Sequence, residues 1–140
     1  MATINSYLNF PGTAEAAFKL YESVFGGELL LVRYSDTPES GKVPEADKNK
    51  LMHASLKLSN GSTLMATDAT EAMGQPLVRG NDTWLSVGVD SEEEAERIFK
   101  GLSEGGKITM PLAKTFWNAY FGMFVDAYGI QWMVNYDYNK

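Results

Sequence analysis

The order of secondary-structure signals in this chain repeats once, and the repeat constrains the fold more than any other feature. Each half begins with a short strand, Ile4–Phe10 or Thr83–Val89, and continues with an amphipathic helix and three further strands. A glycine pair, Gly26-Gly27 or Gly105-Gly106, is expected to end each helix. One such unit cannot cover both faces of its sheet, so the two copies are expected to pack together.

In the first half, the spacing of apolar residues predicts a helix over Ala14–Phe25, with Thr13 as its N-cap. Glu28–Tyr34 is rich in Leu and Val and predicts a strand. The polar stretch Ser35–Asn49 contains two prolines and a glycine, so it predicts a long loop. A hairpin with Asn60-Gly61 in its turn is expected to join the last two strands, Leu51–Leu58 and Ser62–Thr67.

In the second half, Ser91 and Glu94 have the spacing of a capping box in front of an apolar helical stripe. A strand is expected within Lys107–Phe116. The half closes with a hairpin whose turn, Asp126–Gly129, needs the positive φ that Gly129 supplies without strain. The strands of this hairpin are Asn118–Val125 and Ile130–Tyr136.

Local sequence similarity supports the duplication. Residues 6–10 are similar to residues 83–87, and residues 61–65 are similar to residues 129–133. The predicted fold class is therefore α+β, with two tandem βαβββ modules that form a curved, incompletely closed mixed sheet around a cavity. We expect one domain over residues 1–140, with modules at about 1–69 and 82–140 and a linker at about 70–81.

Composition excludes several classes of function. The chain has no cysteine, which removes disulfides, thiolate nucleophiles and cysteine-bound metals. A net charge of −6 argues against nucleic acid and anionic membrane surfaces as partners. No apolar run approaches the length of a membrane span, and no signal peptide is visible, so a cytoplasmic location is expected.

Several motifs of this chain resemble those of the vicinal oxygen chelate superfamily, which includes glyoxalases, bleomycin resistance proteins and extradiol dioxygenases. Within it, the chain is most similar to the PhnB-like branch. The resemblance covers essentially the whole chain and is carried by Tyr7-Leu8-Asn9-Phe10, Ala16-Ala17-Phe18, Val24-Phe25-Gly26-Gly27, Leu51-Met52-His53-Ala54, Met65-Ala66-Thr67-Asp68, Thr115-Phe116-Trp117 and residues 126–133. It implies the paired-module fold and a homodimer.

The resemblance also implies where a metal ion would bind. Metal-dependent members take one ligand from the first and one from the last strand of each module. Those positions here are Tyr7, Met65, Trp84 and Met133, none of which is a usual ligand of a hard or borderline divalent ion. We therefore expect no metal. Sequences of this branch often carry a methyltransferase-like label, but no glycine-rich cofactor loop follows a strand here, so no cofactor is expected.

If these four positions face inward, alternate residues on the same strands face inward too. They predict a ligand-binding wall of aromatic, thioether, hydroxyl and amide side chains. Such a wall suits a small, partly aromatic or apolar molecule; the alternative is that these side chains fill the interior. The predicted lining is Tyr7, Asn9, Met65, Thr67, Trp84, Ser86, Met133 and Asn135. Trp117 and Tyr120 are placed at one end of the cavity, or at a contact between modules or subunits.

His53 is the single histidine of the chain, on the polar side of a predicted strand with Ser55 and Lys57. It is the candidate catalytic residue, because imidazole titrates near neutral pH and can act as a general base. The alternative is a structural histidine bonded to a neighbouring strand. The leading functional hypothesis is metal-independent binding of a small molecule. The alternative is a lyase, isomerase or dioxygenase-type enzyme that uses His53 or a metal.

Overall fold

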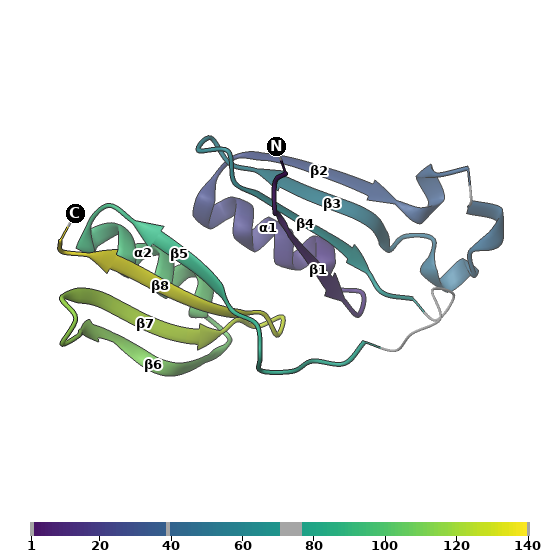
Figure 1. Ribbon diagram of the computed structural model, residues 1–140. Coiled ribbons are helices and arrows are strands. Elements are labelled where there is room, and N and C mark those ends of the chain that lie inside the picture. The colour runs from purple at the N-terminus through teal and green to yellow at the C-terminus, as the bar shows by residue number, and fades with distance from the viewer. Residues whose placement is uncertain (1, 39, 71–76, 140) are drawn as a thin grey trace. The chain divides into compact units, whose positions relative to one another are not determined.

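A computed structural model describes residues 2–38, 40–70 and 77–139. Its contacts divide the chain into two compact units, Met1–Val78 and Arg79–Lys140. Each unit holds one sheet and one α-helix (Figure 1). Residues 71–76 of the linker predicted from the sequence lie outside the described residues.

The first unit has the order strand, helix, strand, strand, strand. Its sheet runs β1-β4-β3-β2, with β1 parallel to β4 and the other neighbours antiparallel. The elements are β1 (Ser6–Phe10), α1 (Ala14–Phe25), β2 (Glu28–Arg33), β3 (Leu51–Lys57) and β4 (Thr63–Asp68).

The second unit repeats this order and topology. Its sheet runs β5-β8-β7-β6, again with the first strand parallel to the last and the other neighbours antiparallel. The elements are β5 (Leu85–Val89), α2 (Glu92–Ser103), β6 (Lys107–Lys114), β7 (Ala119–Val125) and β8 (Gln131–Asp137). The prediction of two tandem βαβββ modules in an α+β fold is confirmed.

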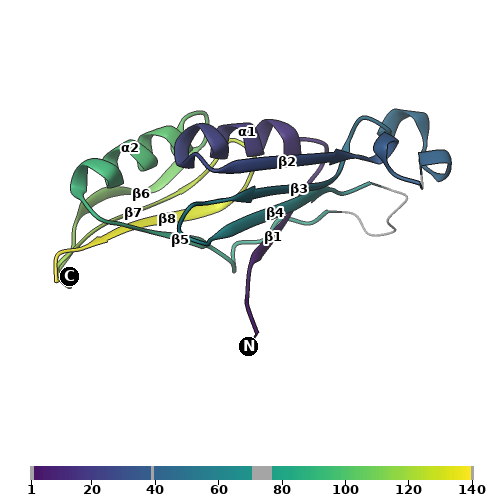
Figure 2. The same ribbon diagram turned by 90° about the horizontal axis from the view of Figure 1, so that it is seen from above.

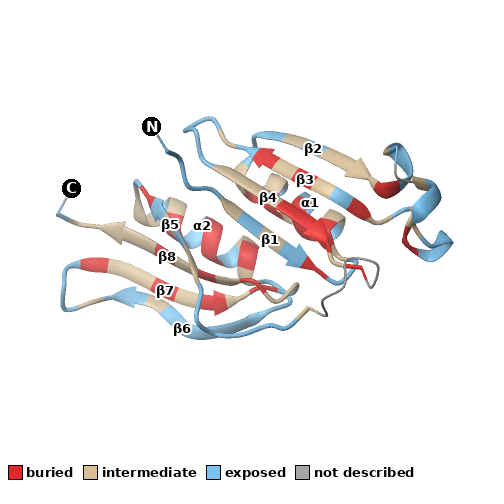
Figure 3. Cartoon of the chain, turned by 45° about the vertical axis from the view of Figure 1, so that its right-hand side comes forward, coloured by how far each residue is buried: buried red, intermediate tan, exposed pale blue. Residues whose placement is uncertain are grey.

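Each helix lies on one face of its own sheet, as Figure 2 shows, and that face holds the core of the unit. In unit 1, Phe18 and Tyr21 of α1 are fully buried, and Phe18 meets the ring of Phe10 on β1 edge-on at 6.2 Å. Burying a side chain of this size contributes about 1.5–3 kcal/mol. In unit 2, Phe99 of α2 packs edge-on against Phe124 at 5.0 Å. Figure 3 shows buried residues on both helices and on strands of each sheet.

The start of α1 is capped differently from the expectation. Thr13 occupies the N-cap position, but its side chain makes no capping hydrogen bond. Instead, the buried carboxylate of Asp68 accepts from the backbone N–H groups of Ala14 and Gly12, and also from Leu51. The prediction of Thr13 as the N-cap residue is confirmed for its position, but the acceptor comes from Asp68 of β4, which is distant in the sequence.

The capping box of α2 is only half present. The Ser91 hydroxyl accepts from the Glu94 N–H as predicted, but the Glu94 carboxylate accepts from Asp90 rather than from Ser91. Both turn glycines behave as expected, with positive φ at Gly61 and Gly129.

In the described part of the polar loop after β2 there are three short 3₁₀ turns, Tyr34–Asp36, Ser40–Lys42 and Glu45–Asp47. Strand boundaries differ from the predicted ones by one or two residues. One boundary affects the site, because β5 begins at Leu85 rather than Thr83. The pairings Tyr7 with Met65 and Ser86 with Met133 then make Ser86, not Trp84, the counterpart of Tyr7. A strand pattern of period two does not distinguish registers that differ by two residues.

Candidate functional site

The sheet of unit 1 has one face away from α1, and most of the candidate residues of this unit lie there. Cross-strand pairing places Tyr7 beside Met65, Met65 beside Ser55, and His53 beside Val32. Neighbouring residues on the same strands, Ala54, Leu56 and Ala66, are fully buried on the side of the helix. We call the opposite surface the helix-free face of unit 1. It comprises Tyr7, Asn9, Leu30, Val32, His53, Ser55, Met65 and Thr67.

Tyr7 and His53 meet on this face although they are 46 residues apart in the sequence. The Tyr7 hydroxyl lies 3.3 Å from Nδ1 of His53, and the ring centroids are 5.9 Å apart. Burial raises the pKa of Tyr7, and the nearby Tyr34 adds to this effect. Tyr7 is therefore a neutral phenol at physiological pH, and it remains 49% exposed.

The sequence reasoning misses the pairing of Tyr7 with His53 and leaves His53 without a recognised partner. The alternation along β3 predicts that His53 shares a face with Ser55 and Lys57, and the strand pairing confirms this. The signal that could have found the partner is the parallel pairing of β1 with β4, which brings Tyr7 to the same face.

The other candidates of unit 1 differ in how they present their polar groups. Asn9 is exposed, and Met65 is half-buried between Tyr7 and Ser55. Thr67 is only 4% exposed, and its hydroxyl lies 3.4 Å from the carbonyl of Leu51, to which it donates. Thr67 thus directs its hydroxyl to the backbone rather than outward.

The helix-free face of unit 2 is more apolar. Ser86 pairs with Met133, Met133 with Met123, and Phe121 with Asn135. The ring of Trp117, in the turn before β7, contacts Phe121 edge-on at 5.8 Å. This face therefore comprises Ser86, Phe121, Met123, Gln131, Met133 and Asn135, with Trp117 at its end.

Two candidates of unit 2 do not join this group. Tyr120 lies on the helix-covered side, where its hydroxyl donates to Glu96 of α2 across 3.0 Å. Burial and the bond to Glu96 raise the pKa of Tyr120. Trp84 precedes β5 and is half-buried. Neither side chain is brought to Met133 by the strand pairing.

The residues at the positions of the superfamily's metal ligands do not fit a divalent ion. After the register correction these residues are Tyr7, Met65, Ser86 and Met133, which offer a neutral phenol, two thioethers and a hydroxyl. Within the described residues, no three His, Cys, Asp or Glu side chains gather closely enough to hold an ion. The donor set thus disagrees with the superfamily's metal site, and metal-free binding remains a prediction.

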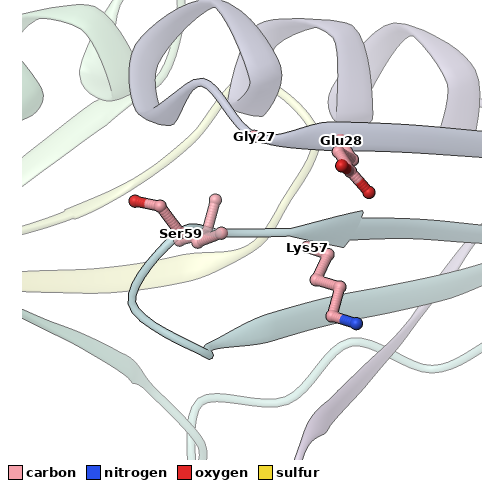
Figure 4. Close-up of a pocket in the computed structure, with 5 residues that line it drawn as sticks. Gly27, Glu28, Lys57 and Ser59 are labelled. Atoms are coloured by element: carbon pink, nitrogen blue, oxygen red, sulfur yellow. The ribbon is translucent and has the colours of Figure 1, made fainter.

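A shallow hollow of about 300 Å³ lies at the other end of β3 (Figure 4). It is lined by Gly27, Glu28, Lys57, Leu58 and Ser59. None of these is a candidate site residue. Gly27 has a positive φ, and a Cβ there would stand 2.6 Å from the Lys57 carbonyl oxygen, so the backbones touch at this point. Neither Tyr7 nor His53 is among the residues that line the hollow.

The family model of 3-demethylubiquinone-9 3-methyltransferase matches residues 2–135. The chain belongs to this family. Its sequence is 40% identical to protein PA1353 from Pseudomonas aeruginosa, with a TM-score of 0.87 over 98% of both chains. It is 28% identical to a putative 3-demethylubiquinone-9 3-methyltransferase, the PhnB protein from Bacillus cereus, with a TM-score of 0.78, covering 96% of this chain and 99% of that one.

The chain is also 29% identical to protein YjdN of Escherichia coli, over 94% of this chain and 93% of YjdN. A glyoxalase/bleomycin resistance protein/dioxygenase family enzyme from Burkholderia phytofirmans shares the fold, with 18% identity, a TM-score of 0.59 and coverage of 94% and 96%. The PhnB-like family and the glyoxalase/bleomycin resistance fold are thus confirmed. The family name does not assign a reaction, because one fold hosts many chemistries. Among the described residues, no helix is long and apolar enough to span a membrane.

Proposed function

We propose that this protein binds a small, partly aromatic or apolar molecule without a metal ion, on the helix-free face of unit 1. The observation that carries the proposal is the Tyr7–His53 pair, two rings 5.9 Å apart that are joined by a polar contact on a partly exposed sheet face. Rings and the thioether of Met65 suit a flat ligand, and a few polar groups suit its orientation.

The cavity predicted from the sequence remains part of the proposal. So do the homodimer and the cytoplasmic location, which sedimentation and cell fractionation would test. The apolar helix-free face of unit 2, with Phe121, Met123 and Met133, has a composition that supports the same ligand class.

The experiment is a thermal-shift screen of flat aromatic compounds, performed with and without a chelator. A ligand that binds only the folded protein raises the melting temperature progressively with its concentration, with about 2.7 kcal/mol of stabilisation at one hundred times its Kd. We expect the shift to persist in chelator and to weaken in Tyr7→Phe. Tyr136→Phe is the matched control, because Tyr136 pairs with Tyr120 on the helix-covered side. A shift that disappears in chelator would overturn metal-independent binding.

A second function is favoured by the same contact. If Nδ1–H of His53 donates to the Tyr7 hydroxyl, the ring is oriented and Nε2 is left as a general base, so a lyase or isomerase reaction is the alternative. The enzyme hypothesis predicts that His53→Ala abolishes turnover of a bound compound, whereas the binding hypothesis predicts no turnover in either protein.

A further inference from the structure

The contact between Tyr7 and His53 has a preferred direction. A neutral phenol and a neutral imidazole can each donate or accept, but the phenol is the more acidic donor and the imidazole nitrogen the more basic acceptor. Tyr7 stays protonated because its pKa is raised. A phenol that donates to Nδ1 of His53, 3.3 Å away, leaves Nε2 as the ring nitrogen that carries a proton.

The Nε2–H group then has nothing to bond to within the described residues, where Tyr7 supplies the side-chain hydrogen bond of His53. On the helix-free face, the cross-strand neighbour of His53 is the apolar Val32, and the thioether of Met65 lies on the adjacent strand beside Ser55. The charged pair at the end of this sheet, Glu28 and Lys57, is four residues from His53 along β3, or roughly 13 Å.

From this arrangement we infer the class of ligand. The molecule bound on the helix-free face of unit 1 carries a hydrogen-bond acceptor, such as a carbonyl or carboxylate oxygen, which His53 Nε2–H meets while the apolar part lies on Met65 and Val32. Tyr7 is a positioning residue, since it fixes which nitrogen of His53 donates. The inference rests on the proposed function and adds the chemistry that the ligand must have.

The single histidine makes a direct test possible. In protein labelled with ¹⁵N-histidine, the two ring nitrogens belong to one residue, and their chemical shifts at a pH where the ring is neutral report which of them is protonated. We expect a protonated Nε2 and an unprotonated Nδ1. A ring protonated on Nδ1 would overturn the inference whether or not any ligand binds.

The ligand class is tested with two probes of nearly the same shape. Acetophenone has a carbonyl group, and α-methylstyrene has a C=CH₂ group in its place. One hydrogen bond corresponds to about a fivefold difference in Kd, so acetophenone should bind at least about fivefold more tightly and shift the Nε2 resonance. In Tyr7→Phe the preference should fall below about twofold, whereas Tyr136→Phe should keep it.

The outcomes separate this inference from the proposed function. Equal binding of both probes would overturn the acceptor inference and leave aromatic binding intact. If neither probe binds at its solubility limit, the result would count against both the acceptor inference and the proposed function. A preference for acetophenone that survives Tyr7→Phe would overturn the positioning role of Tyr7.

Discussion

The buried carboxylate of Asp126 provides the most quantitative test of how unit 2 is held together. Asp126 is 3% exposed and begins the turn between β7 and β8. Its Oδ1 accepts from the backbone N–H groups of Tyr128 and Ile130 at 2.8 and 3.0 Å. Its Oδ2 accepts from the indole N–H of Trp132 at 2.9 Å. One side chain thus closes the turn and fixes the largest ring of the core.

Asp126→Asn keeps the shape of the side chain and removes one acceptor. If the amide oxygen keeps the two backbone donors, the new NH₂ group faces the indole N–H of Trp132, and two buried donors oppose each other. A lost hydrogen bond to a charged group is worth about 1.5–3 kcal/mol, and a buried donor without a partner costs about 1–3 kcal/mol. We expect Asp126→Asn to lower the free energy of unfolding by about 2.5–6 kcal/mol.

The assay is urea denaturation at neutral pH, with linear extrapolation to water. The control is a double-mutant cycle with Trp132→Phe, which removes the indole N–H. The cost of Asp126→Asn should fall by at least about 1 kcal/mol in the Trp132→Phe background, because the opposed donor is gone. A cost below about 0.5 kcal/mol for Asp126→Asn alone, or equal costs in both backgrounds, would refute the reasoning.

Two further predictions concern packing and alkaline pH in unit 2. A Cβ on Gly122 would stand 2.6 Å from the ring of Phe99, so Gly122→Ala should lower the free energy of unfolding by about 1–3 kcal/mol, measured by urea denaturation. Gly88 on β5 is the control, because a Cβ there would lie in open space. Gly88→Ala should stay within about 1 kcal/mol of wild type. Burial and the Glu92 carboxylate raise the pKa of Tyr138 from 10.0 to about 12. The contribution of the protonated Tyr138 to the free energy of unfolding is therefore complete below pH 10 and is lost as the pH rises through 12. Urea denaturation across this range should show a smaller loss for Tyr138→Phe than for wild type; equal losses would contradict the assignment.

The sequence is sufficient for the elements that depend on local signals. The repeat of strand, helix and three strands, the bounds Ala14–Phe25 of the first helix and the turn at Gly129 follow from periodicity and glycine chemistry, and the structure has them. Alternation along β3 also places His53 on the face opposite Ala54 and Leu56, as observed.

Long-range contacts are beyond that reasoning. The helix cap from Asp68 and the partner of His53 both depend on which strands become neighbours, and β1 lies beside β4 rather than beside β2, the next strand in the chain. The predicted equivalence of Trp84 with Tyr7 is wrong for a related reason, whereas its role in ligand binding stays a prediction. Its apolar neighbours fit a strand of period two, and only the pairing with β8 shows that the strand starts at Leu85.

The corrected register allows the two halves to be compared position by position, and the comparison places the polar pair of rings in unit 1. Because Met65 and Met133 are equivalent, Tyr7 corresponds to Ser86 and His53 corresponds to Phe121. The duplicated scaffold therefore carries a hydrogen-bonded pair of rings in unit 1 and a hydroxyl with a purely apolar ring in unit 2. A site with matching metal ligands in both halves would need similar chemistry at equivalent positions. The observed divergence instead supports the proposal of a ligand whose polar end meets the Tyr7–His53 pair of unit 1.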